Sequence, residues 1–341
     1  MKLNTYTLTL LSTLLAAPLV ALSAADAPAK VEKPPQVPAP FVYDGNPERL
    51  KYELPLKPDE NVSYGPHRMQ VIYFWRATSD KPTPLLVYIH GGGWSGGDRS
   101  VVRHLLQPAL EAGISVASVE YRTIKDSTAD GVVPPVKGPM VDCARALQFC
   151  RSKAVEWNLD KTKVALAGGS AGACTSLWLA FHDDLADPQS ADPVARESTR
   201  VLCAAVSGAQ TTLDPHQMRE WTPNSKYGAH AFGISADAKT KTSSFQMFWD
   251  AREQLLPWIK EYSPYALVSA GDPPVGLFYG TPPNLGQEEK DPTHTANFGV
   301  KLKEHCDAHR VTCELVYPGA PDVKHTGESA YIRAHLRPEL K

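Results

Sequence analysis

One serine stands among small residues at the end of an apolar run, in the stretch VALAGGSAGACTSLWLAF. Residues 163–169 before it are typical of a strand, and residues 171–182 after it are typical of a helix. A strand that turns sharply into a helix needs small neighbours, and Gly168 and Gly172 meet that need. Such a turn lifts the hydroxyl of Ser170 above the sheet, in front of the positive end of the helix dipole. Ser170 is therefore a candidate nucleophile, with a Gly-rich phosphate loop or a plain tight turn as the alternative.

A second glycine-rich stretch, YIHGGGWSGGD (88–98), follows another predicted strand earlier in the chain. Packing does not explain Gly91, Gly92 and Gly93, because glycine has no side chain and costs conformational entropy. Their N–H groups can converge on the negative charge that develops at a carbonyl oxygen, where each donor is worth about 3 kcal/mol. We expect His90 to brace this loop through a hydrogen bond rather than to act as a base.

Together, HGGGW and GGSAG resemble motifs of the α/β-hydrolase superfamily. Within it, the chain is most similar to the hormone-sensitive-lipase-like carboxylesterases and the related carbohydrate and feruloyl esterase-like (BD-FAE-like) group, over roughly residues 65–340. The resemblance implies an α/β fold, a catalytic Ser170 and a triad in the chain order Ser, Asp or Glu, His, without a cofactor. It also implies an oxyanion hole formed by the N–H groups of Gly92, Gly93 and Ala171.

The triad needs a histidine, because a serine hydroxyl is a poor nucleophile without a base within hydrogen-bond reach. His325, in YPGAPDVKHTGES, follows the last predicted strand and precedes the final helix, where the resembling family carries its histidine. We therefore predict His325 as the base, with His294 and His309 as competitors. The chain order of the triad argues against three earlier histidines, His182, His216 and His230.

The acid of the triad should follow the predicted strand VGLFYG (275–280). Asp291 does so and precedes a predicted helix, although the intervening TPPNLGQEEK is longer than is usual in the resembling family. Glu288 and Glu289 are rivals that are more typical of a solvated charge pair, and Asp272 precedes the strand beside two prolines that favour a turn. The predicted triad is Ser170, Asp291 and His325.

The elements that must position these residues alternate along the chain. Strands are predicted at 70–75, 84–90, 114–121, 163–169, 201–209, 275–280 and 313–318. Helices are predicted at 99–113 (with a kink or break at Pro108), 139–157, 171–182 and 295–308. This alternation predicts one α/β-hydrolase domain, residues 43–341, with a mostly parallel sheet covered by helices on both faces. Insertions at 183–199 and 211–262 interrupt it, and the aromatic residues of the second could roof a pocket or simply hold the insertion in place.

The first residues of the chain have the composition of a secretory signal peptide. Lys2 precedes an apolar segment, and Ser23, Ala24 and Ala25 suit a cleavage site, so residues 1–25 are predicted to be removed. A membrane anchor is the alternative, but the apolar segment is short for a span. Residues 26–42, rich in Pro and Ala, are predicted to form a linker. The predicted location is secreted or periplasmic, with no stable membrane span after cleavage.

The composition of the chain argues against some classes of binding partner. The chain has 341 residues, 43% of them hydrophobic, and a formal net charge of -2 without a basic tract, which argues against nucleic acid. None of the six cysteines has the spacing of a zinc site. Cys143 and Cys150 fall on one predicted helix too far apart to bridge, whereas Cys306 and Cys313 flank a short turn and are the best candidates for a disulfide. Cys174 and Cys203 are expected in the core.

These observations predict an exported serine esterase that needs no cofactor or metal and acts on a small-molecule or carbohydrate ester. An acetylated or feruloylated carbohydrate is one candidate substrate, and a small aliphatic ester is another. The first alternative function is a serine peptidase of the prolyl-oligopeptidase type, although too few residues precede the sheet to form the usual propeller. The second is a catalytically inactive carbohydrate-binding protein with a hydrolase fold.

Overall fold

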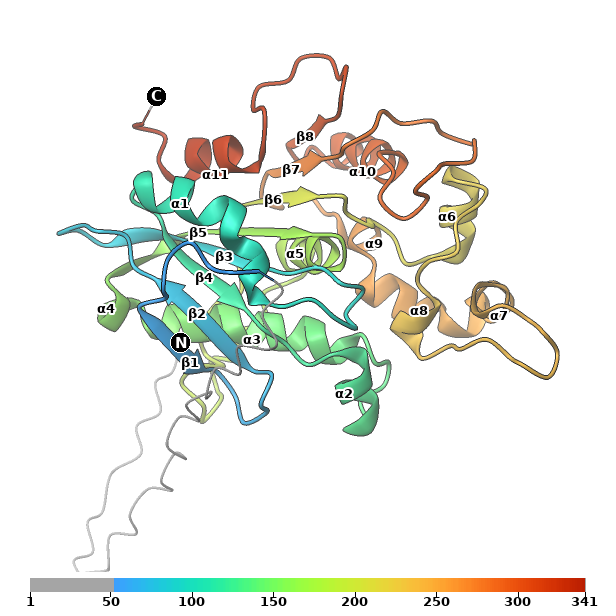
Figure 1. The fold of residues 1–341 in the computed structure, drawn as a ribbon, viewed down its shortest axis with the longest axis horizontal. Coiled ribbons are helices and arrows are strands. Elements are labelled where there is room, and N and C mark those ends of the chain that lie inside the picture. The colour runs from blue at the N-terminus through green and yellow to red at the C-terminus, as the bar shows by residue number, and fades with distance from the viewer. Residues whose placement is uncertain (1–51, 341) are drawn as a thin grey trace, which may run out of the picture. The chain divides into compact units, whose positions relative to one another are not determined.

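The computed structural model describes residues 52–340, so the predicted signal peptide (1–25) and linker (26–42) lie outside the described residues. Eight strands form one sheet in the order β1-β2-β4-β3-β5-β6-β7-β8 (Figure 1). β2 pairs antiparallel with β1 and β4, and all other neighbours are parallel. The strands are β1 (Glu60–Ser63), β2 (Val71–Trp75), β3 (Thr83–Ile89), β4 (Ser115–Val119), β5 (Leu159–Gly169), β6 (Cys203–Ser207), β7 (Val275–Phe278) and β8 (Cys313–Val316).

Helices cover both faces of this sheet, as an α/β fold requires. They are α1 (Arg103–Glu111), preceded by the 3-10 turn η2 (Arg99–Val102), α2 (Ile124–Ala129), α3 (Lys137–Ser152), α4 (Ala154–Trp157), α5 (Ala171–Phe181), α6 (Pro215–Trp221), η3 (Ala229–Phe232, 3-10), α7 (Ser244–Asp250), α8 (Arg252–Tyr262), α9 (Pro264–Leu267), α10 (Asn297–Ala308) and α11 (Glu328–Leu336). No helix within residues 52–340 combines the length and apolar composition that a bilayer span requires.

The core lies in two layers because successive strand residues point to opposite faces. On β3, Leu85 and Val87 pack with residues of α3, α5 and α10. Leu86 and Tyr88 pack with residues of α1 and α11 on the other face. All seven residues of β3 are buried, which explains why residues 84–89 form an unbroken apolar run.

The mostly parallel sheet and the alternation of elements are confirmed, and several elements differ from the sequence-based expectation. The helix predicted at 139–157 is two helices, α3 and α4. Strand β1 was not predicted, because it is short and three of its four residues are polar. It pairs with β2, with Glu60 opposite Phe74. Pro108 does not end its helix, since α1 continues through it to Glu111.

The cysteines are reduced in this structure. All six lie within the described residues and are buried free thiols. Cys143 and Cys150 share α3, as predicted. The predicted disulfide between Cys306 and Cys313 is not formed. The pKa of the Cys313 thiol is raised, mainly by a hydrogen bond with the Cys306 thiol and secondly by burial.

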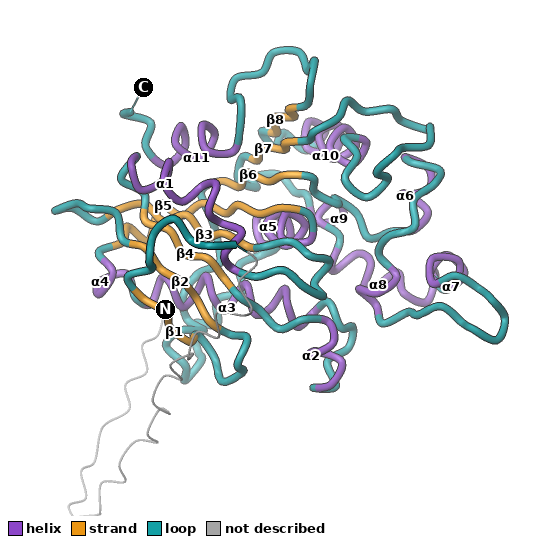
Figure 2. Tube along the Cα trace, in the orientation of Figure 1, coloured by secondary structure: helices purple, strands orange, loops and turns teal. Residues whose placement is uncertain are grey.

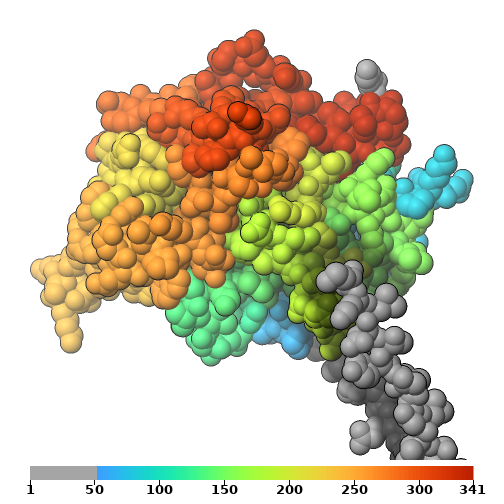
Figure 3. Space-filling model, turned by 180° about the vertical axis from the view of Figure 1, so that it is seen from behind, coloured from blue at the N-terminus to red at the C-terminus, as the bar shows by residue number. Residues whose placement is uncertain are grey.

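The two insertions have different positions. Residues 211–262 contain α6, η3, α7 and α8, which lie beyond the carboxyl ends of the parallel strands (Figure 1) and form a continuous mass in yellow and light orange on the surface (Figure 3). Residues 183–199 are instead fastened to α3, where the Gln148 side-chain amide donates to the carbonyls of Leu185, Ala195 and Glu197 at 3.4, 3.2 and 2.8 Å. Only the longer insertion is placed to cover the end of the sheet where Ser170 lies.

The close approach of α5 to β3 depends on Gly172, and we expect Gly172→Ala to destabilise the fold by about 3 kcal/mol. A Cβ atom there would lie 2.1 Å from the carbonyl oxygen of Ile89, which is backbone and cannot move aside easily. Gly280→Ala is the control, because a Cβ at Gly280 would have no neighbour within 4 Å. Urea unfolding followed by circular dichroism measures both variants, and equal midpoints would contradict the prediction.

Candidate active site

Ser170 occupies the sharp turn between β5 and α5. Its backbone angles, φ 53° and ψ -121°, put a residue with a side chain in a strained region that proteins retain mainly at functional sites. The Ser170 N–H donates to the carbonyl of Ser207 on β6 at 2.9 Å, which fixes the turn against the neighbouring strand. A Cβ at Gly168 would lie 2.5 Å from the Ile89 oxygen, so only glycine allows the two strands and the helix to converge here. The sheet therefore holds the serine at the carboxyl end of a central strand.

A histidine and a carboxylate complete a chain of hydrogen bonds with this serine. His294 Nε2 lies 2.9 Å from Ser170 Oγ, and His294 Nδ1 lies 2.8 Å from Asp291 Oδ2. Because a carboxylate only accepts hydrogen bonds, Nδ1 carries the proton and Nε2 is left to accept from the serine hydroxyl. This order, carboxylate to imidazole to hydroxyl, is the geometry that general-base activation of a serine requires. Asp291 lies at the position that the sequence predicted for the acid.

The prediction of His325 as the partner of Ser170 is wrong. His325 Nδ1 instead lies 2.7 Å from Glu314 Oε2, and the His325 N–H donates to Glu314 Oε1 at 2.8 Å. The loop after β8 therefore turns back onto β8 itself, and the His325 ring packs against Tyr331 of α11. His309, the other competitor, closes the end of α10, with Nδ1 2.9 Å from the His305 carbonyl.

A local turn explains how one short segment supplies both acid and base. Asp291 Oδ1 accepts from the N–H groups of Thr293 at 3.1 Å and His294 at 3.3 Å, which folds the chain so that the imidazole returns to the carboxylate. Gly208 lies against the ring, and a Cβ there would be in ordinary van der Waals contact, 3.4 Å from His294 Cδ2; its φ of +57° is what favours glycine at this position. The Asp-x-x-His spacing was the sequence signal for this turn, and it was visible without the structure.

The environment of Asp291 keeps it charged. Burial alone would raise the pKa of Asp291, but the hydrogen bond and charge of His294, with the two backbone N–H groups, lower it overall. The exposed side-chain fractions of Asp291 and His294 are 62% and 42%, so substrate can approach the pair directly. The predicted rival Glu289 contacts Asn224 through its backbone, at 2.8 and 3.1 Å, rather than His294.

The glycine loop lies directly against the serine. A Cβ at Gly91 would lie 3.2 Å from Ser170 Cβ, and Gly92 and Gly93 have φ angles of +116° and +60° that favour glycine. Within the described residues, no protein group accepts a hydrogen bond from the N–H of Gly92, Gly93 or Ala171. Three such donors beside the serine suit the predicted oxyanion hole, which stays a prediction.

A buried polar cluster supports this loop from below. His90 Nδ1 lies 2.8 Å from the Gly91 carbonyl and His90 Nε2 lies 3.1 Å from Glu120 Oε1. Arg99 pairs with the other oxygen of Glu120 at 3.1 Å, and the Tyr121 hydroxyl donates to the His90 carbonyl at 2.6 Å. The bracing role predicted for His90 is confirmed.

Gln210 holds the segment that carries His294. Its side chain is fully buried, and its amide donates to the carbonyls of Gly208 at 3.0 Å and Thr293 at 2.8 Å. Thr293 directly precedes His294, and the chain between β7 and α10 is loop throughout (Figure 2). No helix or strand therefore holds His294 in place, and the hydrogen bond from Gln210 to the Thr293 carbonyl does so instead. Sequence reasoning missed Gln210 because nothing near it in the chain marks it.

We expect Gln210→Ala to lower kcat for ester hydrolysis about tenfold to 100-fold with little change in KM, because a misplaced base costs rate more than binding. Gln148→Ala is the matched control, since Gln148 also ties a loop to the core, but that loop carries none of the proposed site residues. Steady-state kinetics on both variants, with Tm as a check of folding, test this. An equal fall in kcat for both would show general destabilisation instead.

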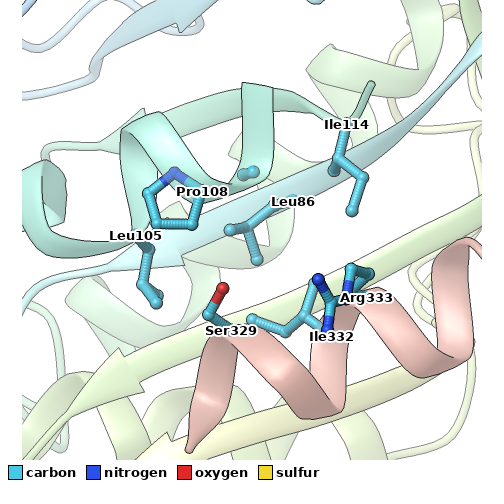
Figure 4. Close-up of a pocket in the computed structure, with 8 residues that line it drawn as sticks. Leu86, Leu105, Pro108, Ile114, Ser329, Ile332 and Arg333 are labelled. Atoms are coloured by element: carbon cyan, nitrogen blue, oxygen red, sulfur yellow. The ribbon is translucent and has the colours of Figure 1, made fainter. Parts of the chain in front are cut away.

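One small cavity lies away from these residues. It lies between α1 and α11 above Leu86 (Figure 4), has a volume of about 10 Å³ and is mostly apolar. That volume is about one water molecule, so the cavity is a packing defect rather than a substrate site.

Comparison with known proteins places these features in a family. The sequence profile of the BD-FAE family matches residues 72–289. Esterase LipC of Mycobacterium tuberculosis (strain ATCC 25618 / H37Rv) is 29% identical over 116 residues, which are 33% of this chain and 27% of that protein. Carboxylesterase NlhH of Mycobacterium tuberculosis (strain CDC 1551 / Oshkosh) is 30% identical over 136 residues, 39% of this chain and 40% of that protein. The chain thus spans less than half the length of these curated relatives.

Solved structures share the fold at low identity. An acetyl ester-xyloside bifunctional hydrolase from Caldicellulosiruptor lactoaceticus has a TM-score of 0.54 at 18% identity, covering 82% of this chain and 85% of its own. The esterase Est2 of Thermogutta terrifontis has a TM-score of 0.57 at 22% identity, covering 79% and 84%. The α/β-hydrolase fold expected from the glycine motifs is therefore confirmed.

Proposed function

This chain belongs to the BD-FAE family, and we propose that it hydrolyses carboxylic esters with Ser170 as nucleophile, His294 as base and Asp291 as the supporting acid. The observation that carries the proposal is the hydrogen-bonded series from Asp291 through His294 to Ser170, at 2.8 and 2.9 Å. Curated esterase relatives of part of the chain support the same reaction class.

The mechanism follows from this geometry. His294 Nε2 takes the proton of the Ser170 hydroxyl while Oγ attacks the ester carbonyl carbon, and the carbonyl electrons move onto its oxygen. The C–O bond to the alcohol then breaks, and the alcohol leaves with the proton from His294. Water, losing a proton to His294, attacks the acyl-enzyme, and Ser170 recovers its proton as the acid departs. The charged Asp291 stabilises the imidazolium in both halves.

The glycine loop is proposed to stabilise the negative oxygen in both tetrahedral intermediates. The N–H groups of Gly92, Gly93 and Ala171 would donate to it, and they need no reorganisation because the loop is braced through His90. The helix dipole of α5, whose first residue is Ala171, adds positive potential at the same point.

The finer proposal is an exported enzyme acting on a carbohydrate ester. The leader-like composition of residues 1–25 supports export to a secreted or periplasmic location. A structural neighbour that is an acetyl ester-xyloside hydrolase supports the carbohydrate class. The aromatic insertion supports it less, because most of its rings are packed in the interior and are not presented to a substrate: Trp221, Phe232, Phe245 and Phe248 are all buried.

The test is to treat the purified wild-type protein with a fluorophosphonate and to locate the adduct by mass spectrometry. We expect stoichiometric labelling at Ser170, because only an activated serine reacts with this reagent. A panel of nitrophenyl esters, acetylated and feruloylated sugars and a peptide then reports the reaction class. An unlabelled protein that cleaves no ester would favour the inactive binding protein, and faster cleavage of the peptide would favour the peptidase.

A further inference from the structure

The hydroxyl of Tyr227 lies beside the glycine loop of the site. If Gly93 had a Cβ atom, that atom would be 3.9 Å from the Tyr227 hydroxyl and 3.5 Å from His230 Nε2. Both side chains come from the long insertion at 211–262, which the catalytic steps described above do not use. The insertion therefore reaches the proposed oxyanion loop through these two residues.

The Tyr227 ring is fixed in relation to the helix that begins after Ser170. It meets the His230 ring edge-on, with centroids 4.9 Å apart, and lies 6.3 Å from the Trp94 ring. The Trp94 indole N–H donates to Thr175 Oγ1 on α5 at 3.0 Å, and Thr175 Oγ1 donates in turn to the Ala171 carbonyl at 2.9 Å. Movement of the phenol relative to the nucleophile is thereby restricted.

The hydroxyl of Tyr227 is buried, yet within residues 52–340 it has no hydrogen-bond partner. Burial raises the pKa of Tyr227, so the phenol stays protonated and can donate. Burial also lowers the pKa of His230, against a backbone hydrogen bond with Gly93, so its ring is neutral at neutral pH. A buried donor without an acceptor is unfavourable, so a ligand atom that supplies the acceptor at this position would be stabilised.

We propose that the Tyr227 hydroxyl forms a specificity subsite that donates a hydrogen bond to a hydroxyl oxygen of the substrate beside the ester group. The inference rests on the esterase function proposed above. A substrate hydroxyl would satisfy the phenol, whereas an aliphatic group in the same place would leave it unpaired, which is the strongest basis on which a buried site can discriminate. The hydroxyl can belong to the alcohol part, as in a partly acylated polyol, or to the acyl part, as in a hydroxy acid ester.

The experiment compares kcat/KM for two pairs of esters in the wild type and in Tyr227→Phe. Propane-1,2-diol monoacetate against propyl acetate places the hydroxyl in the alcohol, and methyl lactate against methyl propanoate places it in the acyl group. We expect the wild type to prefer the hydroxylated member of one pair, and Tyr227→Phe to reduce that preference about tenfold, the loss of one hydrogen bond. The pair that responds identifies the part of the substrate that the subsite reads.

Tyr331→Phe is the matched control, because the Tyr331 hydroxyl is also buried without a partner among the described residues but lies on α11, on the opposite face of the sheet. Its preferences should equal those of the wild type. Unchanged preferences in Tyr227→Phe, an equal loss on all four esters, or the same change in Tyr331→Phe would each overturn the subsite. Fluorophosphonate labelling separates the two proposals: a labelled protein with unchanged preferences overturns the subsite alone, and an unlabelled one overturns the esterase.

Discussion

Replacing His294 with alanine is expected to lower kcat for ester hydrolysis on the order of 10⁴-fold to 10⁶-fold. The reason is that His294 Nε2, 2.9 Å from Ser170 Oγ, is the group placed to accept the serine proton. Without it, Oγ must attack as a neutral hydroxyl, which is a poor nucleophile. The rate of 4-nitrophenyl acetate hydrolysis at saturating substrate, divided by the protein concentration, gives kcat for the wild type and the variant.

His325→Ala is the decisive control for that result. His325 occupies the position that sequence resemblance predicts for the base, but it pairs with Glu314 at 2.7 Å. Its loss should leave kcat within a few-fold of the wild type and reduce the free energy of unfolding by about 1 kcal/mol. A greater loss of activity in His325→Ala than in His294→Ala would restore the sequence-based assignment and refute the one made from the structure.

Ser170→Ala is the second large effect: we expect loss of turnover on the order of 10⁶-fold and complete loss of fluorophosphonate labelling. The substitution removes only the hydroxyl group, so the variant should still bind substrate but should not form the acyl-enzyme. Because alanine also relieves little of the strain at φ 53°, the variant should fold as the wild type does. Equilibrium binding of an ester and the labelling assay separate binding from chemistry.

Ser176→Ala provides the comparison within the same helix. Ser176 is buried on α5, and its hydroxyl donates to the Ala167 carbonyl at 3.3 Å rather than to the histidine. This variant should keep its labelling and nearly all its activity, with a stability loss of about 1 kcal/mol. Labelling of Ser170→Ala at any other residue would mean that the nucleophile has been misplaced.

The choice of His294 shows where resemblance misled. The chain has a histidine after its last strand, as the resembling family does, but that strand supplies Glu314 to hold it. The earlier Asp-x-x-His segment forms a turn through hydrogen bonds to Asp291 Oδ1, and such a turn is readable from spacing. What spacing does not reveal is that Ser170 and Gly208, both distant in the chain, lie against the imidazole.

By itself the sequence determined the features that depend on near neighbours in the chain. The turn at Ser170 needs Gly168 and Gly172, and the buried strand β3 needs its apolar run, so both were legible as patterns. The same holds for the glycine loop that His90 braces. Local geometry and burial produce periodic patterns of residue types, and these patterns can be recognised in a single sequence.

Only the tertiary structure decided which residues meet across the carboxyl edge of the sheet. Gln210 reaches Thr293, and Tyr227 reaches Gly93, over long separations that leave no periodic trace. Whether His294 or His325 faces Ser170 likewise depends on how the loops that carry them fold. The composition of a loop does not determine which of several conformations it adopts. Packing between distant segments selects one of them, and that selection sets the chemistry of the site.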